Sequence, residues 1–324
     1  MCVTEKLIRT NRRRPCPICG KTDWCGYNSQ IVICMRMPSD RLVQNGGWLH
    51  KRLNGGARGG TNGVNVGVVA VADAKVQDAT YKALFGLLRL EEDHVVELIG
   101  NRGLDNKQLC QFRTLRNVKP WEVCKELMAK GHILSGVPGF YLAKDKNSER
   151  QYWNFNYKPG MIFKLENSQQ QTQALQMRLD SPLEKANRYR LFSSGRLCGG
   201  ASSGAPIHVA RPEVIYDDRV WVTEGALKAI VLSHQIKAVV LGAMSAVTWP
   251  SVVTEISCYY TGREIVIAYD QDKYTNSNVM RAVNELGNAL KEKGAQVNTA
   301  DWDRKYKGAD DAALNGCRFV ISRY

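Results

Sequence analysis

The sequence lacks the features of a membrane or secreted protein. No apolar run among its 324 residues approaches the ~20 residues that a transmembrane helix needs. The first residues, MCVTEKLIRTNRRRP, have no apolar centre of the kind a secretory signal carries. No GxxxxGK[ST] phosphate-binding loop and no internal repeat occur. These absences predict a cytoplasmic protein with no membrane partner and no fused helicase motor.

Acidic residues are also in short supply. The chain has 45 Lys or Arg against 31 Asp or Glu, a formal net charge of +14. Residues 1–52 hold ten of these basic residues and only three acidic ones, so half of the net charge lies there. This surplus favours a polyanionic partner, because contacts to phosphates release counterions. A solubilising surface is the alternative, and an anionic membrane is disfavoured because no amphipathic apolar face accompanies the basic run.

Cysteines are concentrated near the start of the chain. Four of the ten lie between Cys16 and Cys34. In a reducing cytosol, clustered cysteines indicate a metal rather than disulfides. Cys16 and Cys19 form a CxxC knuckle that can hold tetrahedral Zn²⁺ from one tight turn. A segment of this length has little core, so we expect bound zinc to supply its folding energy; buried, unligated cysteines are the alternative.

The fourth zinc ligand is open. Cys34 ends a short strand-like stretch and is the third candidate, but no second CxxC follows it, since Met37 occupies the required position. Cys25 and His50 remain. Cys25 is favoured because it is nearer in sequence, whereas His50 could be a surface histidine.

Composition and periodicity divide the chain into four parts. We predict a zinc-binding ribbon at 1–53, a glycine-rich linker at 54–74, a mixed segment at 75–214 and a βα-alternating domain at 215–324. The mixed segment begins with helical periodicity near Lys75 and turns to short strands between Gly139 and Ala210. Strands alternating with helices from Arg219 predict an α/β fold, with a parallel sheet flanked by helices.

Carboxylates follow two of these predicted strands. Glu224 ends the first, and Asp270 and Asp272 follow the strand that begins 40 residues later. If the strands are neighbours, the three acids converge on one sheet edge, where like charges need a cation such as Mg²⁺ or Mn²⁺. Asp310 and Asp311 either join this cluster or cap a helix. Charge repulsion alone predicts that Asp270→Asn leaves the fold equally stable or firmer.

The βα-alternating part resembles a known metal-binding module. VWVTEGALKAIVLS, VVLGAMSAV and EIVIAYDQDKYTNSNVMRAVNEL are together similar to a Toprim domain over about residues 215–316. The resemblance implies an acid–base or metal-binding role for Glu224 and Mg²⁺ binding by Asp270 and Asp272. Gly242 matches the glycine that follows the second strand of that family.

The rest of the chain resembles the same kind of protein. CPIC is similar to the start of the zinc ribbon of bacterial replicative primases, and VVELIGNRGLDNKQLCQFRTL to the segment that opens their catalytic core. The order of ribbon, linker, core and Toprim domain resembles DnaG-like primases of the compact plasmid, phage or mobile-element kind. The implied function is synthesis of short primers on single-stranded DNA from nucleoside triphosphates, with Zn²⁺ and Mg²⁺ or Mn²⁺ as cofactors and a separate replicative helicase as partner.

The resemblance also implies binding residues. Those for nucleotide or template are Arg178, Asp180, Lys185, Arg188 and Tyr189. As an alternative, they are ordinary charges on a β-hairpin. A basic arm is expected to capture template through Arg12, Arg13, Arg14 and Trp24, unless Trp24 is buried in the ribbon. Two other functions stay open: a Toprim nuclease and a non-catalytic single-strand-binding loader.

Overall fold

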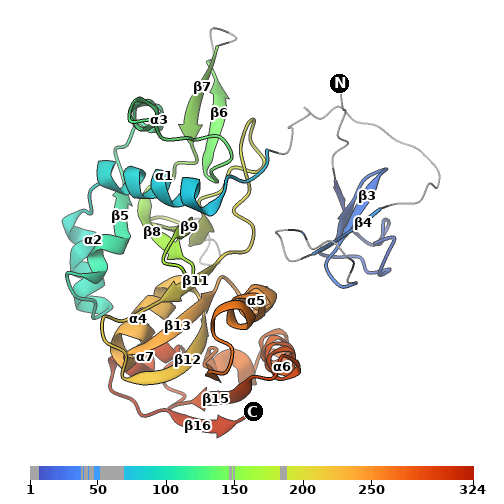
Figure 1. Cartoon of the computed structure of the whole chain (residues 1–324), viewed down its shortest axis with the longest axis vertical. Helices are drawn as coiled ribbons and strands as arrows, with labels where there is room; N and C mark the ends of the chain where they lie inside the picture. Colours follow the sequence, from blue (N-terminus) through green and yellow to red (C-terminus); the bar gives the residue numbers. More distant parts are fainter. Residues whose placement is uncertain are drawn as a thin grey trace. The chain divides into compact units, whose positions relative to one another are not determined.

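The chain forms two compact units in the computed structural model, Met1–Val68 and Val69–Tyr324 (Figure 1). The structure describes residues 7–37, 39, 43, 47–51, 69–145, 148, 150–182 and 188–324. Most of the predicted linker, up to position 68, lies outside these residues, and so does Lys185. Of the helices within the described ranges, none combines the length and apolar character that crossing a membrane requires.

The first unit is a small antiparallel sheet in the order β1-β2-β3-β4. Its strands are Ile8–Arg9, Gly26–Tyr27, Ile31–Cys34 and Trp48–Lys51. The buried residues of this unit that pack together are Val32 and three cysteines. So small an apolar core cannot stabilise a domain without a further cross-link or metal.

The second unit begins with helices packed on a four-stranded antiparallel sheet, in the order β10-β9-β8-β5. Its helical elements are α1 (Ala74–Leu87), α2 (Glu92–Val96), the π-helical turn η1 (Glu97–Asn101), η2 (Gln108–Gln111) and α3 (Pro120–Ala129). Its strands are β5 (Phe112–Leu115), β6 (Phe140–Lys144), β7 (Gln151–Phe155), β8 (Gly160–Glu166), β9 (Thr172–Leu179) and β10 (Tyr189–Leu191). β6 and β7 pair as a separate hairpin.

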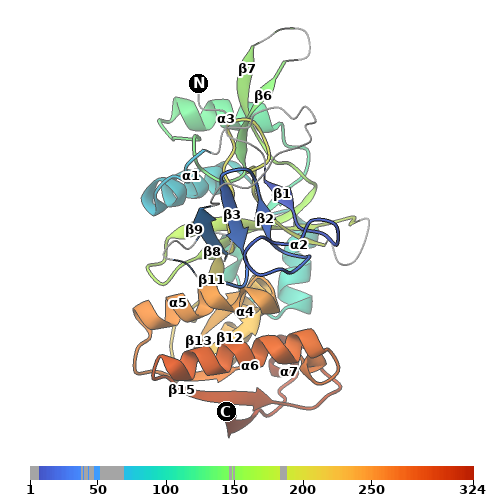
Figure 2. The ribbon, with the colours of Figure 1, turned by 90° about the vertical axis from the view of Figure 1, so that its right-hand side faces the viewer.

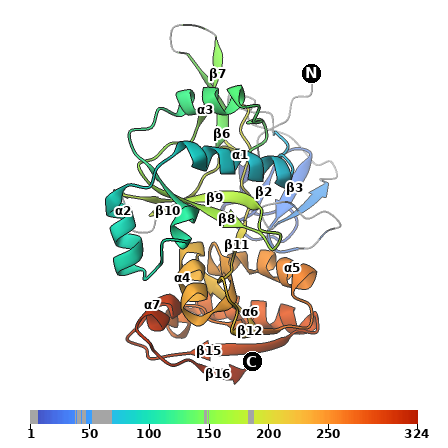
Figure 3. The same ribbon diagram turned by 60° about the vertical axis from the view of Figure 1, so that its left-hand side comes forward.

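The sheet of this first half is buried on both faces. Ile162 of β8 and Leu175 of β9 pack with α1 and α3, whereas Met161 and Phe163 of β8 face the opposite way, into the core that contains α4. Figure 3 shows α1 running beside β8 and β9. Alternate residues of a strand point to opposite faces, so a continuous apolar run is what a doubly covered sheet requires.

The remainder is a six-stranded sheet in the order β11-β13-β12-β14-β15-β16. Its strands are β11 (Ile207–Ala210), β12 (Asp217–Glu224), β13 (Ala238–Ala243), β14 (Glu264–Ile267), β15 (Gln296–Asp301) and β16 (Val320–Arg323). The helical elements are α4 (Ala226–Ile236), η4 (Ala246–Thr248), α5 (Trp249–Tyr259), η5 (Gln271–Tyr274), α6 (Ser277–Glu292) and α7 (Ala309–Leu314).

This sheet confirms the predicted α/β class. The four central strands are parallel, and the edge strands β11 and β16 are antiparallel to their neighbours. The predicted parallel sheet is found in these four strands, and each edge carries one additional antiparallel strand. α4 and α7 cover one face, and α5 and α6 cover the other, as Figures 1 and 2 show. Trp221 of β12 faces α4, while its neighbours Val220 and Val222 face α5 and α6.

Candidate functional site

Four acidic residues gather at the carboxyl ends of the central strands. β12 pairs in parallel with β14 through Val222 and Ile267, so both strands end at the same side of the sheet. Glu224 is the last residue of β12, and Asp270 and Asp272 follow β14. Asp310 enters from the first turn of α7. We call Glu224, Asp270, Asp272 and Asp310 the acid edge.

Two glycines set the position of Glu224. Gly225 turns the chain from β12 into α4 with a φ of +88°, a conformation that side chains disfavour. Gly242 of β13 lies under that turn: a Cβ there would be 2.8 Å from the Gly225 carbonyl oxygen and 2.9 Å from Ala229 Cβ. Only a residue without a side chain lets α4 begin this close to β13, which explains the glycine in the second strand.

Buried carboxyl oxygens without partners mark the acid edge. Glu224 Oε1 is buried and accepts no hydrogen bond from any described residue. Burial, followed by the charge of Asp270, raises the pKa of Glu224 to about 7. Asp310 is 1% exposed, its Oδ1 also has no partner within the described ranges, and burial raises its pKa. Orphaned buried oxygens need an explanation, and carboxylate oxygens are the donors that a divalent cation such as Mg²⁺ prefers. Among the described residues, the group whose ligand atoms already lie within 4.8 Å of one another is the four cysteines of the first unit.

Two lysines already lie on these acids. Lys228 Nζ donates to both oxygens of Asp270, at 2.5 and 2.6 Å. Lys307 Nζ lies 3.0 Å from Asp272 Oδ2 and 3.6 Å from Asp270 Oδ2. The hydrogen bond to Asp272 raises the pKa of Lys307. A backbone hydrogen bond from Gln271 N–H to the Lys307 carbonyl, at 2.9 Å, keeps the two loops together.

Neither lysine was predicted from the sequence, although each has a local signal. Lys228 stands in the first turn of the helix that follows Glu224, where its side chain can reach back over the strand ends. Lys307 directly precedes the Gly-Ala-Asp-Asp stretch that supplies Asp310. Their acidic partners could not be identified without knowing that α4, η5 and α7 meet at one edge.

A cavity of about 230 Å³ opens beside the acid edge. It is lined by Arg102, Gln176, Tyr189, Glu224, Gly225, Ala226, Leu227, Lys228 and Met244. Arg102 comes from the segment after η1, and its Nη1 lies 3.5 Å from Asp310 Oδ2 and 3.9 Å from Asp311 Oδ1. Gln176 in the cavity wall is 6% exposed, and its Oε1 has no partner in the described part of the chain. The cavity therefore brings one carboxylate, Glu224, together with two cations, Arg102 and Lys228, and the amide of Gln176.

The predicted nucleotide- and template-binding residues divide into two groups. Tyr189 lines the cavity, and Arg188 is exposed just before it. Arg178 is instead 5% exposed, and its guanidinium forms a bidentate pair with Glu97. Arg178 therefore ties β9 to η1 rather than presenting a charge at the surface.

Asp180 also takes part in an internal network. It accepts a hydrogen bond from Arg116 Nε at 2.6 Å and pairs with His94 Nε2 at 3.1 Å. These bonds link the end of β9 to α2 and to the residue after β5. The sequence identified Asp180 as a charged residue near a hairpin but could not identify its partners, which lie 64 and 86 positions away.

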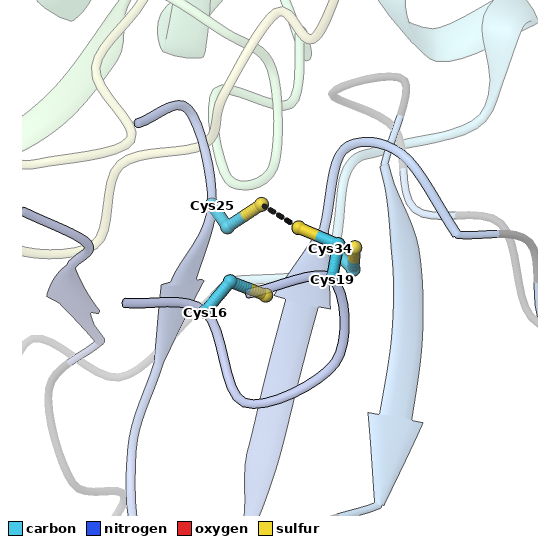
Figure 4. Close-up of side chains that lie close together, drawn as sticks. All are labelled: Cys16, Cys19, Cys25 and Cys34. Carbon is cyan, nitrogen blue, oxygen red and sulfur yellow. Dashed lines mark hydrogen bonds between the residues drawn. The ribbon is translucent and has the colours of Figure 1, made fainter. Parts of the chain in front are cut away.

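The first unit contains a compact cysteine quartet. The Sγ atoms of Cys16, Cys19, Cys25 and Cys34 all lie within 4.8 Å of one another, and those of Cys19 and Cys25 are 3.7 Å apart (Figure 4). Burial raises the pKa of Cys19, but a hydrogen bond from the Lys21 backbone and bonds with its neighbouring thiols lower it to about 7 overall. Four converging sulfurs fit a structural Zn²⁺.

The surrounding backbone supports these sulfurs. Met35 N–H donates to Cys25 Sγ at 3.4 Å, and Met37 N–H donates to Cys34 Sγ at 3.3 Å. His50 stands apart: its Nε2 is 3.0 Å from the Met37 carbonyl oxygen, and its strand register places it opposite Val32. Of the two candidates for a fourth ligand, the structure brings Cys25 to the cysteine group.

The basic arm is displayed on the surface. Arg12, Arg13 and Arg14 are exposed in a turn closed by backbone hydrogen bonds between Asn11 and Arg14, both at 3.0 Å. Trp24 is 69% exposed, so it does not belong to the core of the ribbon. An exposed tryptophan can stack on an unpaired base.

Comparisons with known proteins agree with this architecture. Residues 213–317 match a family described as a domain of unknown function (DUF3854). No curated protein sequence matches the chain.

Several solved primase structures are similar to it. The zinc-binding and RNA polymerase domains of the Aquifex aeolicus primase superpose with a TM-score of 0.55 at 12% identity, covering 77% of this chain and 63% of that one. A Pseudomonas aeruginosa DNA primase domain gives a TM-score of 0.51 at 13% identity, covering 75% of each chain. The RNA polymerase domain of Mycobacterium tuberculosis primase DnaG gives 0.54 at 11% identity, covering 75% of this chain and 80% of that one.

The last of these domains is also similar, with a TM-score of 0.54, in its structure with double-stranded DNA. At these identities the likeness concerns the fold. The chain thus combines a zinc-ribbon-like cluster of four cysteines with a sheet-and-helix core that resembles DnaG primase domains, and it spans 63% of the length of the Aquifex chain.

Proposed function

We propose that this chain is a DNA primase whose six-stranded sheet is a Toprim domain and whose acid edge is the catalytic centre. One observation carries the proposal: Glu224 and Asp270 leave adjacent parallel strands at one edge, and Glu224 borders a cavity lined by Arg102 and Tyr189, on a core with a primase-like fold. The reaction is transfer of a nucleotide to a 3′-hydroxyl on a single-stranded DNA template. The 3′-oxygen forms a bond to the α-phosphorus, and the bond to pyrophosphate breaks.

Each residue of the site has a separate role in this reaction. Asp272, with Asp270 beside it, would hold Mg²⁺ or Mn²⁺, which when bound would neutralise the triphosphate and lower the pKa of the attacking hydroxyl. Glu224, with a pKa of about 7, is suited to accept the proton of that hydroxyl near neutral pH. Arg102 is positioned in the cavity wall to bind phosphate oxygens. Tyr189 offers an aromatic face to a base.

The first unit would serve the template. Zn²⁺ held by the cysteine quartet fixes the fold of the ribbon, and the exposed arginines of the basic arm bind the DNA backbone. A separate replicative helicase is the partner that would expose the single-stranded template, and we assign this protein to the compact primases of mobile elements that recruit one.

A non-catalytic single-strand-binding loader is the second candidate. The observation that favours it is the pair formed by Lys228 with both oxygens of Asp270, because an acid neutralised in this way has less attraction for a metal ion. The cavity beside that pair and the unpartnered Glu224 Oε1 favour the enzyme instead.

One assay separates these functions. The full chain is incubated with single-stranded DNA, labelled nucleoside triphosphates and Mg²⁺ or Mn²⁺. New short products that disappear in Asp272→Asn establish the primase, shortened template identifies a nuclease, and a mobility shift without either identifies the loader. Asp303→Asn is the matched control: this acid is exposed, pairs with Lys305 at 3.4 Å, and should leave synthesis unchanged.

A further inference from the structure

The two lysines of the acid edge differ in how firmly they are held. The Lys228 side chain is 31% exposed and contacts both oxygens of a carboxylate that is itself 6% exposed. The Lys307 side chain is 66% exposed and reaches Asp272 and Asp270 at longer distances, 3.0 and 3.6 Å. Lys307 can swing into solvent at little cost, whereas moving Lys228 would leave the buried Asp270 carboxylate without its main partner.

Lys228 also faces a second buried acid. Both groups lie around Gly308. A Cβ atom built on this glycine would overlap Asp310 Oδ1 and would lie 3.6 Å from Lys228 Nζ, so the ammonium and the carboxyl border the same small space. A side-chain cation therefore occupies the region that Asp270 and Asp310 share, where a divalent ion would otherwise balance them.

An ammonium and a divalent cation cannot both occupy this region. Like charges a few ångströms apart repel strongly where water is excluded, and both oxygens of Asp270 are already engaged. Asp272 differs, because its side chain is 33% exposed and its partner is the largely exposed Lys307. Glu224 Oε1 has no partner among the residues described. The free capacity of the acid edge therefore lies with Asp272, with Glu224 Oε1 and with the unpartnered Oδ1 of Asp310.

We propose that Lys228 is a resident cation that takes the place of one divalent ion, so that the acid edge binds a single Mg²⁺ or Mn²⁺, in exchange for Lys307. The catalytic use of this ion rests on the proposed function. The number of ions bound can be measured whether or not the protein is a primase. Lys228 is in this sense a positioning residue: it fixes Asp270 and supplies one positive charge permanently.

Mn²⁺ binding to the full chain tests the number of ions, with free Mn²⁺ followed by electron paramagnetic resonance. We expect one Mn²⁺ per chain in the parent, none at the acid edge in Asp272→Asn, and two in Lys228→Met. Lys307→Met is the matched control, since it removes a lysine of the same edge without opening a new position. It should still bind one ion, about tenfold tighter because a competing charge is gone. Two ions in the parent, or an unchanged number in Lys228→Met, would overturn the proposal.

Thermal melting supplies the second readout. In EDTA, Lys228→Met should melt below the parent, and Mn²⁺ should restore most of the difference, because the ion replaces the missing charge. A purely structural ion pair predicts no recovery. Lys228→Gln is judged by the same rule, and failure of both variants to fold even with Mn²⁺ present counts against the proposal. Primer synthesis by the parent is scored separately: one ion without synthesis rejects the primase, and synthesis with two ions rejects the resident cation.

Discussion

Asp270 and Asp272 are separated by one residue but lie in different electrostatic environments. The Asp270 side chain is 6% exposed and accepts from Lys228, whereas the Asp272 side chain is 33% exposed and pairs with the largely exposed Lys307. Charge repulsion among the acids alone predicts that Asp270→Asn leaves the fold unharmed. The structure changes that expectation, because the neighbours of Asp270 include a firmly held cation as well as other acids.

The two aspartates should therefore separate stability from activity. Asp270→Asn weakens a buried ion pair, and we expect it to lower the free energy of unfolding by about 1–3 kcal/mol. Asp272→Asn removes only a partly exposed pair, worth less than about 1 kcal/mol. Primer synthesis should fall about 100-fold or more in both. Denaturant unfolding and a primer assay on the same preparations decide this, and equal decreases in stability would contradict it.

Zinc content should distinguish Cys25 from His50. Cys25→Ser removes one of four sulfurs that lie within 4.8 Å, so the protein should lose its zinc. His50→Gln alters a residue that contacts a backbone carbonyl, and it should keep about one zinc per chain. Metal analysis after gel filtration measures both. A zinc-free Cys25→Ser protein whose ribbon retains its protease resistance would argue against a structural metal.

Single-stranded DNA binding should depend on the basic arm. Replacing Arg12, Arg13 and Arg14 with Ala should weaken binding and reduce the slope of log K against log salt by about 0.7 for each phosphate that is no longer neutralised. The control replaces three exposed basic residues elsewhere, Lys119, Lys130 and Arg281. Fluorescence anisotropy over a salt series gives the slopes. An unchanged slope in the arm variant would exclude the arm from template capture.

The stability of the protein should fall below about pH 6.5 through His208. This histidine is 1% exposed, its Nδ1 accepts from the Glu166 backbone N–H at 3.0 Å, and burial, with Arg211 as a second cause, lowers its pKa to about 3. Because the unfolded chain takes up a proton near pH 6.5 that the folded chain refuses, stability decreases as the pH falls from about 6.5 towards 3, by up to about 1.4 kcal/mol per unit.

His208→Asn provides the comparison, since its side-chain oxygen can replace Nδ1 as the acceptor. Urea unfolding at about pH 7, 6 and 5 should show a steeper decline in the parent than in the variant. Parallel declines would mean that His208 is protonated in the folded state, contrary to the effect expected of its burial.

Sequence periodicity was sufficient for the elements of the C-terminal half. The alternation of strands and helices predicted from Arg219 onward occurs, because apolar runs and helical periods are local properties that burial on both sheet faces requires. The placement of Glu224 and Asp270 at one edge followed from the rule that neighbouring parallel strands end together.

Pairings between distant residues could not be predicted in the same way. Arg102 and Asp310 are 208 positions apart, and the partner of Arg178 is Glu97 in a π-helical turn. A charge in a sequence does not say whether its counterion is another side chain or a ligand, so Arg178 was expected at the template and is found in an internal pair. Lys228 was overlooked for the opposite reason, since a lysine on a helix is usually solvated.

Gly242 limits which mutations this protein can accept near the acid edge. The position bears no functional group, yet a single methyl there would push against the start of α4 and displace the backbone that carries Glu224. Tolerance to mutation at the acid edge is therefore limited by shape as well as by charge. During evolution the lysines of this edge could be replaced, which would alter its charge. Gly242 in the strand beneath them could hardly be replaced by any other residue, because a side chain there has no room.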